Sequence, residues 1–294
     1  MMAPMRFEKW QALGNDYLIL EASQLGFALT AMAVRRLCDR HTGPGADGVL
    51  ELSPPDAPGF VARLRIFNPD GSEAELSGNG AREAIMYLRR SGWTEQDEFA
   101  IQTAAGEIRP TILGPSTCRV DMGAARLRSE HFPGGGPDGA GEVGGQRFRH
   151  VAIGNPQCAI RVAGVEQLRA LDLPAVGPAI EHDPRFPNRT NVSWWCDTGP
   201  GVIRARIFER GVGETRSSDT GACGAAVSYV LEGGESPVTV RLDGGELKVA
   251  VNASLRVQLT GWALPVYRGE LSEELVAELR GAGPGDVDEA PLRA

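Results

Sequence analysis

Polar and apolar residues alternate over several short stretches of the chain, which is the pattern of strands that bury one face. These stretches are apolar-alternating or rich in β-branched side chains, and Gly, Asp or Asn bounds them. They lie at 17–20, 64–67, 151–153, 202–208, 238–242, 247–251 and 255–259. The sequence therefore predicts a protein dominated by short strands.

Helical periodicity is confined to fewer segments, at 30–40, 81–90 and 222–231. Segment 81–90 carries Ala84, Ile85 and Leu88 on one face and closes at Gly92. Segment 222–231 is small and apolar almost throughout, which predicts a helix buried on all sides. Strands followed by a loop and a buried helix in each half indicate the α+β class, with a curved, mostly antiparallel sheet around a central helix.

One long sequence segment occurs twice in the chain, about 141 residues apart. Segments 63–84 and 204–225 align without a gap and share nine identical residues, and 12–15 is echoed by 152–155. Two copies of so long a unit indicate gene duplication and two pseudo-symmetric domains. We expect an N-terminal half at 1–122, a duplicated C-terminal half at 123–265, and a frayed tail at 281–294; residues 266–280 are a candidate to pack back on the first half.

The glycine-rich segment 133–146 holds seven glycines in fourteen residues and has no apolar periodicity. It is interpreted as a mobile excursion near the boundary between the halves.

Composition excludes several classes of protein. Hydrophobic residues make up 42% of the 294 and charged residues 23%, as in ordinary globular proteins. The formal net charge of −8, without a basic stripe, argues against a nucleic-acid partner. No apolar run approaches the ~20 residues of a membrane span, and residues 1–7 lack the apolar core of a signal peptide. We expect a cytoplasmic protein.

Neither a metal nor an organic cofactor is expected. The five cysteines and four histidines are dispersed without metal-ligand spacing, so the cysteines are predicted to be reduced thiols. The two lysines, Lys9 and Lys248, lie outside the repeated segment, so no lysine is expected to carry pyridoxal phosphate. Segment 43–48 matches GxGxxG by letter, but it follows a helical pattern rather than a strand, which disfavours dinucleotide binding.

Each copy of the repeat contains a serine that opens a predicted helix, Ser77 in one and Ser218 in the other. Free N–H groups at a helix N-terminus suit a carboxylate. A single such serine is usually an ordinary helix cap, but two at matched spacing favour an anion site. Arg210, just after the second repeated strand, adds a planar donor for a carboxylate.

The motifs that surround these serines resemble those of the pyridoxal-independent diaminopimelate epimerase family. They include Gly-Asn-Asp at 14–16, the run 39–48, Phe-Asn-Pro-Asp-Gly-Ser-Glu at 67–73, Ser-Gly-Asn-Gly-Ala-Arg at 77–82, Gly-Asn-Pro at 154–156, Asn-Val at 191–192, Glu-Arg-Gly-Val-Gly-Glu-Thr at 209–215 and Thr-Gly-Ala-Cys at 220–223. The resemblance covers the chain to about residue 270. It implies two similar halves with a site between them, a homodimer, and a cofactor-independent isomerase of the lysine and diaminopimelate pathway.

The resemblance also implies the roles of individual residues. Ser77 and Ser218 occupy the positions of the two family cysteines, which act as base and acid on opposite faces of the substrate α-carbon. Their hydroxyls are expected to face one cleft, with Glu209 and Arg210 fixing the ammonium and carboxylate of the ligand. The implied substrate shell is Asn15, Asn68, Gly78, Asn79, Asn155, Gln157, Asn191, Glu209, Arg210, Asp219 and Thr220.

The departures from the family pattern occur at the positions that the family uses for catalysis. Both cysteines are serine, a family glycine is Asp219, and a family histidine is Gln157. An engineered pair of cysteine-to-serine exchanges would leave Asp219 and Gln157 unexplained, so natural divergence is favoured. A serine hydroxyl yields no anion near neutrality unless a neighbouring base takes its proton. Asp219 is a candidate substitute base, although the start of a helix stabilises it as the anion.

Two functional hypotheses follow. The first is an amino-acid racemase or epimerase, either diaminopimelate epimerase itself or a relative that uses a single base. The second is a diverged member of the family that binds an amino acid or related metabolite without catalysis. Exchange of the α-hydrogen with solvent separates them, because only an enzyme accelerates that exchange.

Overall fold

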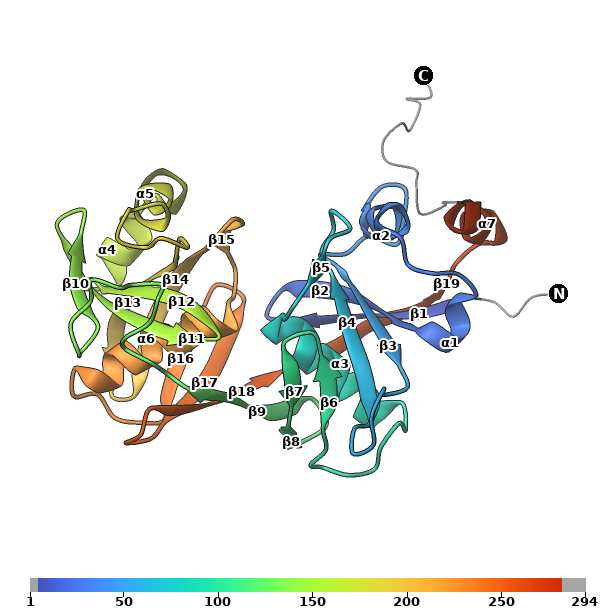
Figure 1. Ribbon diagram of the computed structural model, residues 1–294, viewed down its shortest axis with the longest axis horizontal. Helices are drawn as coiled ribbons and strands as arrows, with labels where there is room; N and C mark the ends of the chain where they lie inside the picture. The colour runs from blue at the N-terminus through green and yellow to red at the C-terminus, as the bar shows by residue number, and fades with distance from the viewer. Residues whose placement is uncertain (1–4, 282–294) are drawn as a thin grey trace, which may run out of the picture. The chain divides into compact units, whose positions relative to one another are not determined.

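The computed structural model describes residues 5–281 and divides the chain into two compact units (Figure 1). The first unit comprises Met1–Ser116 with Ala263–Ala294, and the second is Thr117–Trp262. The predicted frayed tail lies outside the described residues, apart from Gly281 at the end of the last helix. The sequence placed the first boundary after residue 122. Residues 117–122 instead belong to the second unit, because they form a strand paired with 256–262.

The first unit is one sheet with a central helix. The strands of this sheet are β1 (Arg6–Ala12), β2 (Asn15–Glu21), β3 (Val49–Ser53), β4 (Ala62–Phe67), β5 (Glu73–Ala74), β6 (Ile101–Thr103), β7 (Gly106–Ile108) and β19 (Leu264–Glu270). Strand β8 (Pro110–Ile112) is not part of it and pairs with the strand over Thr117–Ala124. Its helices are α1 (Ala22–Leu25), α2 (Ala31–Cys38), α3 (Gly78–Arg90) and α7 (Glu273–Gly281). The sheet order is β19-β1-β2-β3-β4-β6-β7, so the last strand of the chain lies beside the first.

The second unit has the same plan. Its strands are β9 (Thr117–Ala124), β10 (Ala140–Val143), β11 (Gln146–Ile153), β12 (Asn155–Arg161), β13 (Asn191–Gly199), β14 (Val202–Glu209), β15 (Gly213–Thr215), β16 (Val238–Leu242), β17 (Gly245–Val251) and β18 (Arg256–Trp262). Its helices are α4 (Val165–Ala170), α5 (Leu173–Glu181) and α6 (Asp219–Leu231). The sheet runs from β10 through β11, β12, β13, β14, β16, β17 and β18 to β9.

The pairing directions of the two sheets repeat strand for strand. From β1 to β7 the successive partners pair antiparallel, parallel, antiparallel, parallel and antiparallel. From β11 to β17 the order of directions is the same. A short strand closes the repeated one in each unit, β5 on β4 and β15 on β14. The duplication read from the sequence is therefore a duplication of fold.

The central helices α3 and α6 begin directly after the repeated serines. Every residue of α3 from Asn79 to Leu88 is buried, and α6 is buried from Asp219 to Ser228 except at Thr220. The sequence placed both helix starts three residues later, because Gly78-Asn79 and Asp219-Thr220 have turn-like side chains. The serine caps override that preference, since each Ser side chain binds the N–H three residues on.

Part of the glycine-rich segment is a hairpin, so its interpretation as a mobile excursion was wrong there. Strand β10 pairs with β11 from Ala140 opposite Arg149 to Val143 opposite Gln146. Gly144 and Gly145 join the two strands with φ of 56° and 75°. A two-residue turn with both φ positive matches the twist of the strands and favours glycine.

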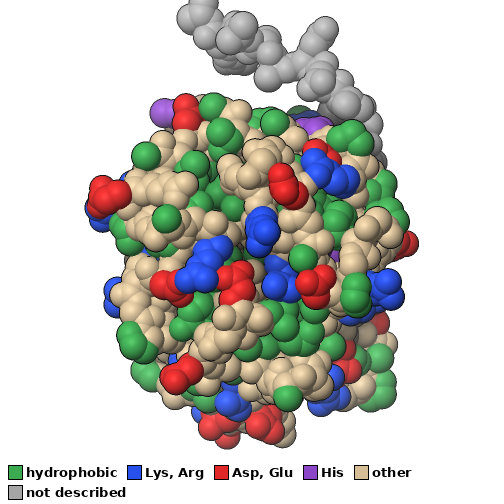
Figure 2. Space-filling model, turned by 90° about the vertical axis from the view of Figure 1, so that its left-hand side faces the viewer, with side chains coloured by type: hydrophobic (Ala, Val, Ile, Leu, Met, Phe, Trp, Pro, Cys, Tyr) green, Lys and Arg blue, Asp and Glu red, His purple; other side chains and the backbone are tan. Residues whose placement is uncertain are grey.

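The surface carries charges of both signs, in line with the 30 basic and 38 acidic residues of the sequence. Figure 2 shows acidic and basic side chains interspersed over the face that it presents. Among the helices within residues 5–281, none has the length and apolar character needed to cross a membrane.

Candidate active site

The first half-site is built around Ser77, which caps α3. Its Oγ accepts a hydrogen bond from the Gly80 N–H at 3.1 Å and another from the Tyr17 hydroxyl at 3.1 Å. Two donors occupy the lone pairs of this oxygen, so the hydroxyl is left to act as a donor itself. Tyr17 lies on β2, two residues after Asn15.

The second half-site is built around Ser218, which caps α6 in the same way. Its Oγ accepts from the Gly221 N–H at 3.3 Å and donates to Glu209 Oε2 at 2.9 Å. The Thr215 hydroxyl donates to the other oxygen, Glu209 Oε1, at 2.7 Å. Each oxygen of the Glu209 carboxylate thus accepts a hydrogen bond from a hydroxyl group.

The surroundings of Glu209 in the second half-site favour the protonated form of its carboxyl group. Burial raises the pKa of Glu209, and the nearby charge of Asp219 raises it further. The hydrogen bonds from Thr215 and Ser218 stabilise the anion and act in the opposite direction without cancelling the rise. A carboxyl group with a raised pKa is the type of group that moves protons near neutral pH.

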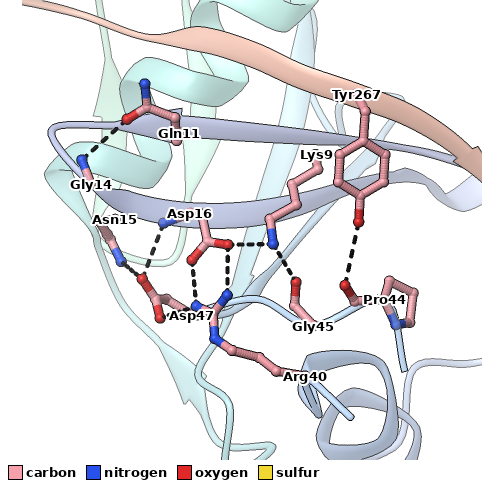
Figure 3. A network of polar contacts seen from close by, with 10 residues as sticks. All are labelled: Lys9, Gln11, Gly14, Asn15, Asp16, Arg40, Pro44, Gly45, Asp47 and Tyr267. Atoms are coloured by element: carbon pink, nitrogen blue, oxygen red, sulfur yellow. Dashed lines mark hydrogen bonds and ion pairs between the residues drawn. The ribbon is translucent and has the colours of Figure 1, made fainter. Parts of the chain in front are cut away.

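A polar network on the first unit holds Asn15 in place (Figure 3). The Asn15 amide donates to Asp47 Oδ2 at 3.0 Å, and Asp47 Oδ1 accepts from Arg40 at 2.7 Å. Arg40 also binds Asp16 at 2.6 Å, and Lys9 Nζ lies 2.5 Å from Asp16 Oδ2. With its amide nitrogen fixed, Asn15 can present its carbonyl oxygen in one orientation.

The same network keeps Asp16 ionised. Burial alone would raise the pKa of Asp16, but hydrogen bonds from Arg40 and Lys9 outweigh it and lower the pKa to about 2. Lys9 also donates to the Gly45 carbonyl at 2.6 Å, which ties β1 to the loop that carries Asp47. Segment 43–48, which matched a dinucleotide motif by letter, thus positions a side chain of the predicted substrate shell.

The amides of the second unit form a corresponding group. The Gln157 amide donates to Asn155 Oδ1 at 2.5 Å, and the Gln157 side chain is fully buried against α6. Gln157 Oε1 has no hydrogen-bond partner among the described residues, so a polar acceptor is left inside this half-site. Asn191 uses both ends of its amide, donating to the Pro156 carbonyl at 2.9 Å and accepting from the Arg210 N–H at 2.8 Å.

Arg210 lies at the end of the second repeated strand, as the sequence indicated. Its guanidinium donates to the Asn188 carbonyl at 2.8 Å, and its backbone is fixed by Asn191. The next residue is also fixed, since the Gly211 N–H donates to Glu181 Oε1 at 2.8 Å. The turn after β14 is therefore held by buried side chains of its own unit.

The remaining predicted residues of the first unit are held in different ways. Asn68 donates to Ser72 Oγ at 3.0 Å within an exposed turn. Asn79 accepts from the buried guanidinium of Arg82 at 2.5 Å. Glu83 is fully buried on the same helix, and burial raises its pKa well above the usual range.

The structure thus brings the predicted residues together within each unit. In the second unit Ser218, Glu209 and Asp219 form one cluster, and Asn155 joins Gln157. The shared cleft for Ser77 and Ser218, and the ligand-binding role of each residue, stay predictions. Sequence reasoning missed three contributing side chains, namely Tyr17, Asp47 and Thr215. Asp47 and Thr215 lie inside quoted motifs, so their signal was present, whereas nothing in the residues around Tyr17 singled it out.

Comparison with known proteins identifies the family. The model of the family described as diaminopimelate epimerase matches residues 7–128 and 149–263. Diaminopimelate epimerase of Moorella thermoacetica is 39% identical over 281 residues, covering 90% of this chain and 99% of the relative. That of Synechococcus sp. strain JA-3-3Ab is 39% identical over 286 residues, covering 93% and 100%. The chain belongs to the diaminopimelate epimerase family and is, in class, an isomerase.

Solved structures share the fold at low sequence identity. A phenazine biosynthesis protein of the PhzF family from Bacillus anthracis has a TM-score of 0.69 at 17% identity, covering 92% of this chain and 100% of its own. A hydroxyproline epimerase from Agrobacterium vitis has a TM-score of 0.63 at 16% identity, covering 95% and 97%. These likenesses show that the chain shares its fold with both proteins.

Proposed function

We propose that the protein inverts the α-carbon of an amino acid without a cofactor, with diaminopimelate as the leading substrate. The observation that carries the proposal is the pair of matched half-sites, in which a serine caps a buried helix at the position of each family cysteine. Each helix N-terminus offers N–H groups that suit the substrate carboxylate. That carboxylate also takes up the charge that develops when the α-proton leaves.

The remaining parts of the site follow from the same reasoning. Asn15, Asn68, Asn79, Asn155, Gln157 and Asn191 supply or support polar contacts, and Arg210 supplies the cation for a carboxylate. The two half-sites are proposed to act on opposite faces of one α-carbon.

The test is exchange of the α-hydrogen in deuterium oxide, followed by mass spectrometry and chiral separation. We expect deuterium uptake into diaminopimelate together with interconversion of its LL and meso forms. Uptake without inversion would indicate a relative that uses one base. Saturable binding without uptake would instead support the non-catalytic binder, for which the loss of both thiols is the favouring observation.

A homodimer is a further part of the proposal. Strand β19 ends its sheet, and it exposes Leu264, Val266 and Tyr267 by 42%, 53% and 43%. An edge strand with exposed apolar side chains is a template for pairing with a second chain. Light scattering should give twice the chain mass, and Val266→Lys should shift it toward the monomer. A wild-type monomer at micromolar concentration would contradict the homodimer.

A further inference from the structure

Arg210 is anchored by two segments of the second unit that meet at one buried carboxylate. Segment 188–191 binds it twice, because the Asn188 carbonyl accepts from its guanidinium at 2.8 Å and Asn191 accepts from its backbone N–H at 2.8 Å. Glu181, the last residue of α5, joins this segment to the turn after β14. We propose that Glu181 is a positioning residue, which fixes Arg210 for the carboxylate of the ligand. This role rests on the proposed function, in which Arg210 supplies that cation.

The hydrogen bonds of Glu181 reach both of these segments. Its Oε1 accepts from the Gly211 N–H at 2.8 Å, directly after Arg210, and from Arg189 Nη1 at 3.2 Å. Its backbone carbonyl accepts from the Thr190 N–H at 3.3 Å. Only 5% of the Glu181 side chain is exposed, so its hydrogen bonds are little weakened by water. An arginine has five N–H donors, so Arg210 can be anchored by one of them and bind a carboxylate with the others.

Two local preferences are broken where Glu181 meets Arg189. A carboxylate at the C-terminus of a helix lies at the negative end of the helix dipole, and the last turn of α5 has no basic residue to offset it. Arg189 has a φ of 57°, which lies in the left-handed region that residues with a side chain avoid. Departures of this kind persist where the surrounding structure requires them, and they are concentrated at functional sites. The pair is therefore better explained by the turn that it holds than by its own stability.

Helix α5 lies close enough to β14 for Glu181 to reach the turn. Gly177 is four residues before Glu181, on the same face of the helix, and it packs against the ring of Phe208 near the end of β14. A Cβ at Gly177 would lie 2.6 Å from two atoms of that ring, so this close approach requires glycine. Figure 1 shows α5 and β15 at the same end of the second unit. The helix and the strand end thus form one support for the turn that carries Arg210.

The first unit closes its equivalent turn in a different way. The counterpart of Gly211 is Asp70, whose Oδ1 accepts from the N–H and the hydroxyl of Ser72 in the same turn, at 2.9 Å and 2.6 Å. The counterpart of Arg210 is Pro69, which has no charge to orient. The carboxylate that holds the turn therefore comes from within it in the first unit. In the second unit it comes from α5, and there an arginine follows the strand.

The first measurement is hydrogen–deuterium exchange of full-length variants without ligand, followed by mass spectrometry of peptides that cover 209–213. Glu181→Ala removes the acceptor of the Gly211 N–H, so exchange there should become roughly tenfold faster. Glu181→Gln keeps an oxygen at that position, so exchange should stay within about threefold of the wild type. Glu166→Ala is the matched control, because Glu166 is an exposed carboxylate of the preceding helix α4 and pairs with Arg169. It should exchange like the wild type.

The second measurement is binding and turnover of diaminopimelate by the same variants. A residue that positions a binding group affects binding more than turnover, so Glu181→Ala should raise Kd and KM by about tenfold while kcat stays within about threefold. Glu181→Gln should recover most of this loss, because its amide oxygen still accepts from the Gly211 N–H. Gly177→Ala keeps Glu181 but displaces α5, so it should raise KM as well.

The outcomes separate this role from the proposed function. Wild-type protein that neither binds diaminopimelate nor exchanges its α-hydrogen would overturn the proposed function, and with it the ligand assigned to Arg210. If the wild type binds diaminopimelate and Glu181→Ala binds it equally well, only the positioning role is wrong. Faster exchange of the turn in both Glu181 variants, with Kd and KM unchanged, would also contradict that role, because Glu181 would then support the fold alone.

Discussion

Ser77 and Ser218 have the same backbone setting and opposite chemical partners. Both cap a buried helix and bind the N–H three residues on, at 3.1 Å and 3.3 Å. Ser77 then receives a hydrogen bond from the phenol of Tyr17, whereas Ser218 gives one to the carboxylate of Glu209. The two copies have kept the same backbone around each serine. The side chains that bind the two serine hydroxyls differ.

The difference arises at two pairs of equivalent positions. The counterpart of Glu209 is Asn68, and the counterpart of Tyr17 on β2 is Gln157 on β12. Each exchange replaces a group that can carry a proton with an amide that cannot. Two copies of one fold thus place different chemical groups beside equivalent serines.

The largest effect should come from Arg210, whose counterpart in the first repeat is Pro69. If the second half-site alone supplies the cation for the substrate carboxylate, Arg210→Ala should weaken ligand binding by about 2–5 kcal/mol. Calorimetric titration with diaminopimelate measures this, and Arg241→Ala, an exposed arginine paired with Glu246, is the control. Unchanged affinity in Arg210→Ala would mean that the carboxylate is bound elsewhere.

The second effect concerns how closely the two central helices approach their sheets. A methyl group at Gly221 would lie 2.7 Å from Ile207 Cδ1 and 2.9 Å from its Cγ2, so Gly221→Ala should destabilise the protein by about 1–3 kcal/mol. At Gly80 the contacts are looser, with Leu50 Cδ2 at 3.1 Å and Ser77 Oγ at 3.3 Å, so Gly80→Ala should cost less than Gly221→Ala. Urea unfolding of both variants tests this contrast, and equal losses would contradict it.

A third difference should appear in the pH dependence of stability. Glu83 is buried in the first unit and its counterpart is Gly224. Burial raises the pKa of Glu83, so the folded state keeps a proton that the unfolded state releases above about pH 4.3. The contribution of Glu83 to stability is therefore fully present below that pH and is lost as pH rises toward the folded pKa, by about 1.4 kcal/mol per pH unit.

Glu83→Gln should remove this loss, so that its melting temperature gains on the wild type as pH increases. Glu75→Gln, which changes an exposed carboxylate of the same unit, should follow the wild-type curve. Parallel curves for Glu83→Gln and wild type would show that Glu83 ionises without cost in the folded protein.

The smallest effects should come from the ion pairs that the repeat conserves. Arg65 binds Glu73 at 2.8 Å and Arg206 binds Glu214 at 2.7 Å, each between a repeated strand and its short partner. Partly exposed pairs contribute less than about 1 kcal/mol and are screened by salt. Glu73→Gln and Glu214→Gln should therefore each change the free energy of unfolding slightly, and less in 1 M salt. A loss above 2 kcal/mol in either would show a structural role beyond the pair.

Much of the fold was accessible from sequence because its signals are local and occur twice. The repeated Arg, Glu, Ser and Gly residues marked both strands and both helix starts, and the structure gives each a contact that explains its identity. The hairpin at Gly144–Gly145 was missed because one exposed turn carries little apolar periodicity.

The partners of the two serines could not be read from the sequence. Glu209 was recognised as part of the site, but its bond to Ser218 depends on how the turn after β14 folds back beside β15. Tyr17 is separated from Ser77 by sixty positions, and no motif links them. Contacts between distant segments follow from tertiary packing, which a single sequence does not display.

The pairing of β19 with β1 has a consequence for synthesis of the chain. Strand β1 precedes the second unit in the chain, whereas its partner, residues 264–270, emerges from the ribosome only after the whole second unit. The second unit is continuous in sequence, so it can complete its sheet while the first still has one edge open. Pairing across so long a separation is slow, and an open edge invites association with other chains. Nascent chains that stall before residue 264 should therefore be a preferred substrate for chaperones, with a finished second unit and an unfinished first one.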